Sequence, residues 1–281
     1  AWVARARANN GLLPDNVGHS GQVGEYCKGK WYGGRYGWTF PHGPLTLQKA
    51  TLDAAAIAYL LTRDAAYLEL PRRQMDRILE LGKVADIRDY DMSVSERWTS
   101  QFASMGEQYE TFLVPYRYGD AGLFDWQPIS PVYLVTLWNL SRADEDWERI
   151  ERVRRAEAFD WNEVFPFHNK EDSGHESPWV RFLDGANPRF PEHTLNATYQ
   201  LVCRRLEQVR QDRDVGTQHH VHHWQWANPV SSEALIQLTL GGPQPIYNGG
   251  LLHSRLRYFD PVRRRPGLPE EVGALVEKLD A

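Results

Sequence analysis

The sequence predicts a mainly α-helical protein in which helical hairpins circle an axis as an (α/α) toroid. Apolar residues recur at helical spacing in two neighbouring segments, LTLQKATLDAAAIAYLLT (45–62) and DAAYLELPRRQMDRILELGK (64–83). Long irregular connections follow at 83–130, 157–192 and 214–230, and another precedes at 14–44. Loops of this length are uncommon in compact domains unless they serve a function. In a toroid, such loops gather at one end and build a cleft.

The first two segments are expected to form an antiparallel helical hairpin. Leu52, Ala56 and Leu60 fall near one face of the first helix. Asp64 is a candidate N-cap of the second helix, and Pro71 is expected either to kink that helix or to start its second part.

Five further helices and one β element complete the expected fold. The helices are expected at 131–139, 145–156, 193–213, 232–240 and 269–279. Residues 243–260 alternate in character around an Asn-Gly-Gly turn, which predicts a small β-hairpin near the C-terminus.

Length and composition indicate a single globular domain over residues 1–281. We interpret the chain as trimmed at one or both ends, because it starts as if inside a helix and ends directly after one. The net charge of −5 without a basic face argues against nucleic-acid binding. The sequence contains no apolar run that could span a bilayer. Cys27 and Cys203 could form one disulfide, which the sequence does not decide.

Eleven Trp and thirteen Tyr residues concentrate in Gly- and Pro-rich segments between the helices. The combination of NGLLPDNVG, GKWYGGRYGWTFPHG and the Ala-rich helix after it resembles the (α/α) toroid carbohydrate-active enzymes, namely the polysaccharide lyases and six-hairpin glycosidases. The resemblance implies a ring of six or seven hairpins, incomplete within 281 residues. The expected compartment is secreted or periplasmic, with no signal peptide in this chain.

The stretch GKWYGGRYGWTFPHG is the first candidate site. Trp and Tyr present flat faces that match the C–H faces of sugars, and glycines let the backbone approach a ligand. The expected subsite residues are Trp31, Tyr32, Tyr36 and Trp38, with Arg35 pairing to a uronate carboxylate and His42 held before a helix. The alternative is a packed loop that plugs one end of a barrel.

The second candidate is SMGEQYETFLVPYRYGDAGLFDWQP. It interleaves acidic, aromatic and arginine residues, including Glu107, Tyr109, Arg117 and Trp126, as a polar ligand cleft does. The alternative is a solvated loop with ordinary salt bridges.

The third candidate is a helical face in FPEHTLNATYQL. His193 and Asn196 share a face by three-residue spacing, and Tyr199 lies three residues further on. These residue types suit proton abstraction beside a carboxylate. The alternative is a polar first turn that faces solvent.

The fourth candidate is the histidine run TQHHVHHWQWANP. His219 and His223 would share a helical face, whereas His220 and His222 would share a strand face, and either pair could supply two zinc ligands. No third ligand has a fixed spacing. The expectation is therefore that no cofactor is needed, with a divalent metal at His219 and His223 as the alternative.

The leading hypothesis is an enzyme that cleaves an acidic, uronate-containing polysaccharide by β-elimination. Arg, Asn or His neutralises the uronate carboxylate, while Tyr or His serves as base and acid. The expected catalytic residues are His42, His193, Tyr199, Tyr36, Arg117 and Asn196. The expected substrate-binding residues are Trp31, Tyr32, Arg35, Trp38, Glu107, Tyr109, Trp126 and Asn248.

Two alternatives stay open at this point. One is a glycoside hydrolase or sugar epimerase on the same scaffold, since two carboxylates at a suitable separation suffice for hydrolysis. The other is a glycan-binding domain without catalysis. The expected partner is an acidic oligo- or polysaccharide, and the sequence does not indicate an oligomeric state.

Overall fold

The computed structural model describes most of the first 214 residues and a few segments beyond them. The described residues are 1–33, 37–39, 44–90, 109–129, 131–164 and 176–214, with 216, 223, 227–231, 234, 237–238, 259–260 and 265–266. The chain divides into two compact units, Ala1–Trp98 with Met105–Phe159 and Thr99–Ser104 with Asp160–Ala281. A single domain over residues 1–281 stays a prediction.

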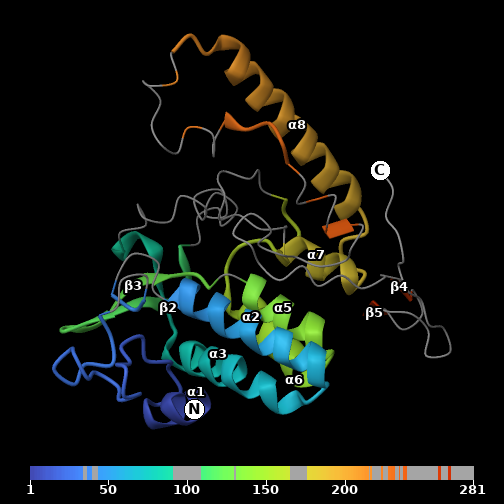
Figure 1. The fold of residues 1–281 in the computed structure, drawn as a ribbon. Coiled ribbons are helices and arrows are strands. Elements are labelled where there is room, and N and C mark those ends of the chain that lie inside the picture. Colours follow the sequence, from blue (N-terminus) through green and yellow to red (C-terminus); the bar gives the residue numbers. More distant parts are fainter. Residues whose placement is uncertain are drawn as a thin grey trace. The chain divides into compact units, whose positions relative to one another are not determined.

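The first unit is built on helices that pack against one another (Figure 1). Its described helices are α1 (Trp2–Ala8), α2 (Pro44–Thr62), the 3-10 turn η1 (Ala65–Leu68), α3 (Glu69–Leu81), α5 (Val132–Ser141) and α6 (Asp144–Ala156). Helix α2 contacts α3 and α5, and α5 contacts α6. Every residue of α5 from Val132 to Leu140 is buried, as expected for a helix that is apolar on all sides.

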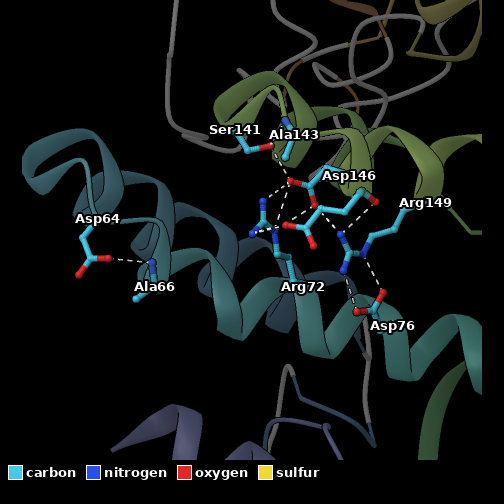
Figure 2. A network of polar contacts seen from close by, with 9 residues as sticks. Asp64, Ala66, Arg72, Asp76, Ser141, Ala143, Asp146 and Arg149 are labelled. Carbon is cyan, nitrogen blue, oxygen red and sulfur yellow. Dashed lines mark hydrogen bonds and ion pairs between the residues drawn. The ribbon is translucent and has the colours of Figure 1, made fainter.

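The predicted first hairpin is confirmed. Arg63 adopts a left-handed φ of 62° after α2, and the Asp64 carboxylate accepts a hydrogen bond from the Ala66 N–H at 2.9 Å (Figure 2). Pro71 lies in the first turn of α3, so it helps to start that helix rather than to kink it.

A three-stranded antiparallel sheet lies in the middle of the first unit. Its strands are β1 (Lys83–Asp86), β2 (Glu110–Gly119) and β3 (Gly122–Gln127), in the order β1-β2-β3. A two-residue turn joins β2 to β3, and the Gly119–Gly122 pair closes the ladder. Helices α2, α3 and α6 all contact β2, so the central strand is covered by the helical layer.

The predicted fold class is therefore wrong. The sheet occupies residues that the sequence analysis interpreted as an irregular connection, and helices α2, α3 and α6 of the first unit pack on its central strand; the described helices show no toroid. The reason lies in β2, where residues 111–116 are all buried and so lack the alternation of a half-exposed strand. Pro115 also reads as a loop residue, although here it pairs with Trp126.

The three-stranded sheet lies in the middle of the chain and not at residues 243–260, where the sequence predicted a hairpin. Most of residues 243–260 lies outside the described residues. The described strands in that part of the chain are β4 (Phe259–Asp260) and β5 (Arg265–Pro266), which pair with each other.

The second unit contains α7 (Glu176–Leu183) and α8 (Phe190–Gln211), which contact each other. The sequence analysis predicted α8 but missed α7, which is short. One stripe of α8 is buried, at Phe190, Thr194, Thr198, Leu201 and Arg205. The helices expected at 232–240 and 269–279 lie largely outside the described residues. No helix in the described part of either unit is both long and apolar enough to cross a bilayer.

A buried carboxylate joins three helices of the first unit (Figure 2). The side chain of Asp146, in the first turn of α6, is 0% exposed. It accepts hydrogen bonds from Arg72 Nη2 of α3 at 2.6 Å, from Arg149 Nη1 at 2.6 Å and from Ser141 Oγ of α5 at 2.5 Å. Arg149 also binds Asp76 of α3, with Nε and Oδ1 2.7 Å apart. Each partner compensates for the cost of removing the Asp146 charge from water.

Replacing Asp146 by alanine should strongly destabilise the first unit. Arg72 and Arg149 are only 17% and 13% exposed and would keep their charges without the shared partner. Breaking a buried pair in this way costs about 3–5 kcal/mol of unfolding free energy. Urea denaturation measures the effect. Glu148→Ala, at an exposed acid of the same helix, is the control and should change stability by less than about 0.5 kcal/mol. Equal stability of the two variants would contradict the role of the network.

Candidate functional site

Backbone hydrogen bonds hold the glycine- and aromatic-rich loop in a defined shape. The N–H groups of Asp15 and Asn16 both donate to the Trp31 carbonyl, at 3.0 and 3.3 Å. Gly24 has a φ of 72°, and a Cβ at this position would lie 2.4 Å from the carbonyl carbon of Gly29. Only glycine fits there, so this part of the loop is specified by its backbone.

Trp38 fixes the loop to the sheet. Its ring is fully buried, and its Nε1 donates to the Leu13 carbonyl at 2.7 Å. Its backbone N–H donates to Asp15 Oδ2 at 2.6 Å, and its carbonyl accepts from the Tyr118 N–H of β2 at 2.9 Å. Trp38 is therefore a core residue in this structure, whereas the sequence analysis expected a sugar subsite.

Three half-buried rings meet beside Trp38: Trp31, Tyr32 and Tyr118, termed the aromatic cluster. The ring centroids of Tyr118 lie 4.7 Å from those of both Trp31 and Tyr32. Trp31 also contacts the Trp38 ring edge-on, at 5.6 Å. Two of the predicted substrate-binding residues are thus brought together, and β2 supplies the third ring.

A charged pair borders the aromatic cluster. Asp120, in the β2–β3 turn, accepts hydrogen bonds from Lys30 Nζ at 2.6 and 2.8 Å and from the Tyr32 hydroxyl at 2.9 Å. The Asp120 side chain is 74% exposed. The hydrogen bond from Lys30 lowers the pKa of Asp120, and the hydrogen bond to Asp120 raises the pKa of Tyr32. At neutral pH the cluster therefore presents a carboxylate, an ammonium and a neutral phenol.

Sequence reasoning missed Lys30, and it placed Asp120 in the second candidate segment, apart from the loop of Trp31 and Tyr32. Lys30 and Asp120 are 90 residues apart in the sequence and meet only because β2 and β3 form a hairpin whose turn returns to the loop. Recognition of the β2–β3 hairpin in the sequence would have predicted that Asp120 lies near this loop. The other candidates of this loop, Arg35, Tyr36 and His42, lie outside the described residues.

The second candidate segment is part of the sheet rather than a loop. Arg117 forms an ion pair with Asp125, with Nε and Oδ2 3.1 Å apart, and both side chains are largely buried. The Arg88 guanidinium lies over the Tyr109 ring, with Cζ 4.1 Å from the ring centroid. Lys83 Nζ lies over the Trp126 ring, 3.9 Å from its centroid. Glu107 lies outside the described residues, as does Asn248.

The third candidate is an exposed face of α8. His193 and Asn196 are exposed, and Tyr199 is 69% exposed. A hydrogen bond with Cys203 raises the pKa of Tyr199, so its phenol stays protonated at neutral pH. Cys203 and Cys27 are both free thiols, so the structure contains no disulfide between them.

The histidine run is only partly described. His223 Nε2 lies 3.3 Å from Asp212 Oδ2, whereas His219, His220 and His222 lie outside the described residues. In the part of the chain that the structure describes, no group of three or more His, Cys, Asp or Glu side chains could hold a metal ion.

Comparison with known proteins identifies the family. A family model described as a domain of unknown function, DUF8034, matches residues 1–236, and the chain belongs to this family. No curated protein and no solved structure matches the chain.

Removing the Asp120 charge and removing the Lys30 charge should shift the pKa of Tyr32 in opposite directions. Asp120→Asn removes the carboxylate that holds the phenol protonated, so the pKa of Tyr32 should fall. Lys30→Met removes a cation that favours the phenolate, so the pKa of Tyr32 should rise further. NMR titration of tyrosine ring carbons measures both values.

NMR titration of the aspartate carboxyl carbons measures the pKa of Asp120. Its lowered pKa means that the Lys30 contact stabilises the fold at neutral pH, and this contribution is lost only as the pH falls below the ordinary range of an aspartate. Lys30→Met should move the pKa of Asp120 upward. A Tyr32 pKa that is the same in the unaltered protein and in both variants would show that the contacts do not form in solution.

Proposed function

We propose that the protein binds carbohydrate on the aromatic cluster. The observation that supports this is the combination of half-exposed Trp and Tyr rings with an exposed Asp–Lys pair at their edge. Sugars present flat C–H faces together with hydroxyls that both donate and accept hydrogen bonds. Aromatic rings match the faces, and a carboxylate and an ammonium match the hydroxyls.

The pair at the edge retains capacity for a ligand. Lys30 has three N–H donors, and in the described part of the chain its hydrogen bonds both go to the Asp120 carboxylate. The Asp120 carboxylate offers about four lone-pair sites, and three hydrogen bonds occupy it. One donor and one acceptor are thus left side by side, an arrangement that suits neighbouring sugar hydroxyls.

The rigidity of the site also supports binding. Trp38 attaches the loop to β2 through a backbone hydrogen bond, and its buried ring packs edge-on against the Trp31 ring. A preformed surface loses little conformational entropy when a ligand binds. The cluster therefore does not have to be ordered by the sugar.

For the chemistry, our proposal is β-elimination of a uronate-containing polysaccharide. Exposed residues of α8 support it, since His193, Asn196 and the protonated phenol of Tyr199 follow one another at three-residue spacing. His193 would take the proton next to the carboxylate, the electron pair would form the double bond as the glycosidic C–O bond breaks, and Tyr199 would protonate the leaving oxygen. Asn196 would donate a hydrogen bond to the carboxylate.

Binding is tested by calorimetric titration with neutral and uronate oligosaccharides. Trp31→Ala and Tyr118→Ala should each weaken binding about tenfold, because each removes a stacking face. Tyr26→Ala removes a tyrosine of the same loop that is 70% exposed and outside the cluster, so it should leave affinity unchanged. Thermal unfolding of each variant separates loss of binding from loss of fold. No binding of any oligosaccharide by the unaltered chain would end the proposal.

Catalysis is tested by following the ultraviolet absorbance of an unsaturated uronate. His193→Ala and Tyr199→Phe should each lower turnover by about 10²–10⁴-fold, the usual contribution of a proton-transfer group. Gln208→Ala, at an exposed position on the same helix, should have no effect. New reducing ends without absorbance would indicate a hydrolase instead. Binding with neither signal would indicate a glycan-binding domain without catalysis.

A further inference from the structure

A second group of aromatic side chains lies on the other face of the sheet. Paired residues of neighbouring antiparallel strands point to the same face, and the face alternates along each strand. Trp126 pairs with Pro115 and Phe124 pairs with Arg117, two residues of one face of β2, so the register places both rings on that face although Asp125 between them has a left-handed φ of 58°. Tyr118 of the aromatic cluster is in the alternate register and belongs to the opposite face. The two groups of rings are therefore separate.

This second group is accessible. Phe124 is 40% exposed, and Trp126 is partly exposed two residues further along β3. Two exposed rings on neighbouring positions of one strand can contact successive parts of an extended ligand.

A lysine from another strand joins these rings. Lys83 of β1 pairs with Leu113, which puts it on the same face as Trp126. Its Nζ lies 3.9 Å from the Trp126 ring centroid and 5.1 Å from that of Tyr90. Lys83 is itself exposed, so its ammonium stands at the edge of the aromatic surface.

The charge of Lys83 is not neutralised by an acid. In the described part of the chain Lys83 makes no ion pair, whereas Lys30 is paired with Asp120 and Arg88 with Asp86. Contact with two rings orients the ammonium but leaves its charge and its N–H donors for a ligand. A cation beside aromatic faces matches a sugar ring that carries a carboxylate.

We propose that the surface formed by Phe124, Trp126, Lys83 and Tyr90, termed the sheet-face site, binds a uronate residue of an acidic polysaccharide. This inference rests on the proposed carbohydrate-binding function and adds the class of sugar. The Trp126 and Phe124 rings would contact the sugar, and Lys83 would bind its carboxylate. Trp126 was expected from the sequence to bind substrate, whereas Lys83, Tyr90 and Phe124 were not.

The test compares affinities of matched neutral and uronate oligosaccharides by calorimetry. Lys83→Met should weaken uronate binding about tenfold, as expected for loss of a charge-assisted hydrogen bond, and leave neutral binding unchanged. Met retains the apolar contact with Trp126. Lys83→Arg should restore most of the affinity. Lys28→Met, which removes the same charge at another exposed lysine, is the control and should change neither affinity.

The outcomes separate this inference from the proposed function. If Trp31→Ala weakens binding and Lys83→Met does not, the sheet-face site is wrong and the aromatic cluster stands. If only Lys83→Met weakens uronate binding, the sheet-face site stands and the aromatic cluster is not the site. Equal losses in Lys83→Met and Lys28→Met would show a general charge effect and overturn the inference. Competition by a single-stranded oligonucleotide at the affinity of the uronate would also overturn it.

Discussion

The buried carboxylate of Asp146 is the interaction on which the first unit depends. An ionised aspartate that is fully removed from water is stable only when its lone pairs are satisfied, and Arg72, Arg149 and Ser141 do this from α3, α6 and the end of α5. The requirement fixes how these helices lie relative to one another. An apolar residue would tolerate small shifts of a helix, but this network does not.

The helical arrangement in turn positions the sheet. Helix α3 ends at Leu81, and β1 begins two residues later at Lys83. At the end of α6, the Ala158 N–H donates to the Thr111 hydroxyl of β2 at 3.0 Å. Two of the helices held by Asp146 are therefore connected to neighbouring strands, one by the chain and one by a hydrogen bond. The Asp146 network therefore determines where the sheet lies in the first unit.

The sheet then determines both candidate sites through its register. A slip of one residue in β2 would move Tyr118 to the face that now carries Arg117 and would separate it from Trp31. The same slip in β3 would turn Trp126 away from Lys83. The left-handed φ of 58° at Asp125 marks the place where β3 departs from regular geometry, and there its carboxylate pairs with Arg117. This pair anchors the register between the two sites.

The sequence predicted what periodicity encodes and missed what tertiary contacts decide. Helices α2, α3, α5, α6 and α8 were predicted because apolar spacing marks one face of a helix. The sheet was missed because β2 is buried on both faces. Composition singled out the aromatic loop as a candidate site, but composition does not distinguish Trp38 in the core from Trp31 at its edge.

Lys30 and Lys83 also differ in a way that the sequence does not show, and the difference indicates which site favours an acidic sugar. Lys30 and Lys83 are chemically identical, yet Asp120 neutralises the first, while aromatic rings hold the second without an acid in the described residues. The aromatic cluster therefore carries no net charge, and the sheet-face site carries one positive charge. A chain with a net charge of −5 repels an acidic polymer, but at physiological ionic strength salt largely screens this repulsion at separations beyond about 8 Å. At contact distance the local cation outweighs the distant charges, so an acidic sugar gains most at Lys83, which has no acidic partner among the described residues.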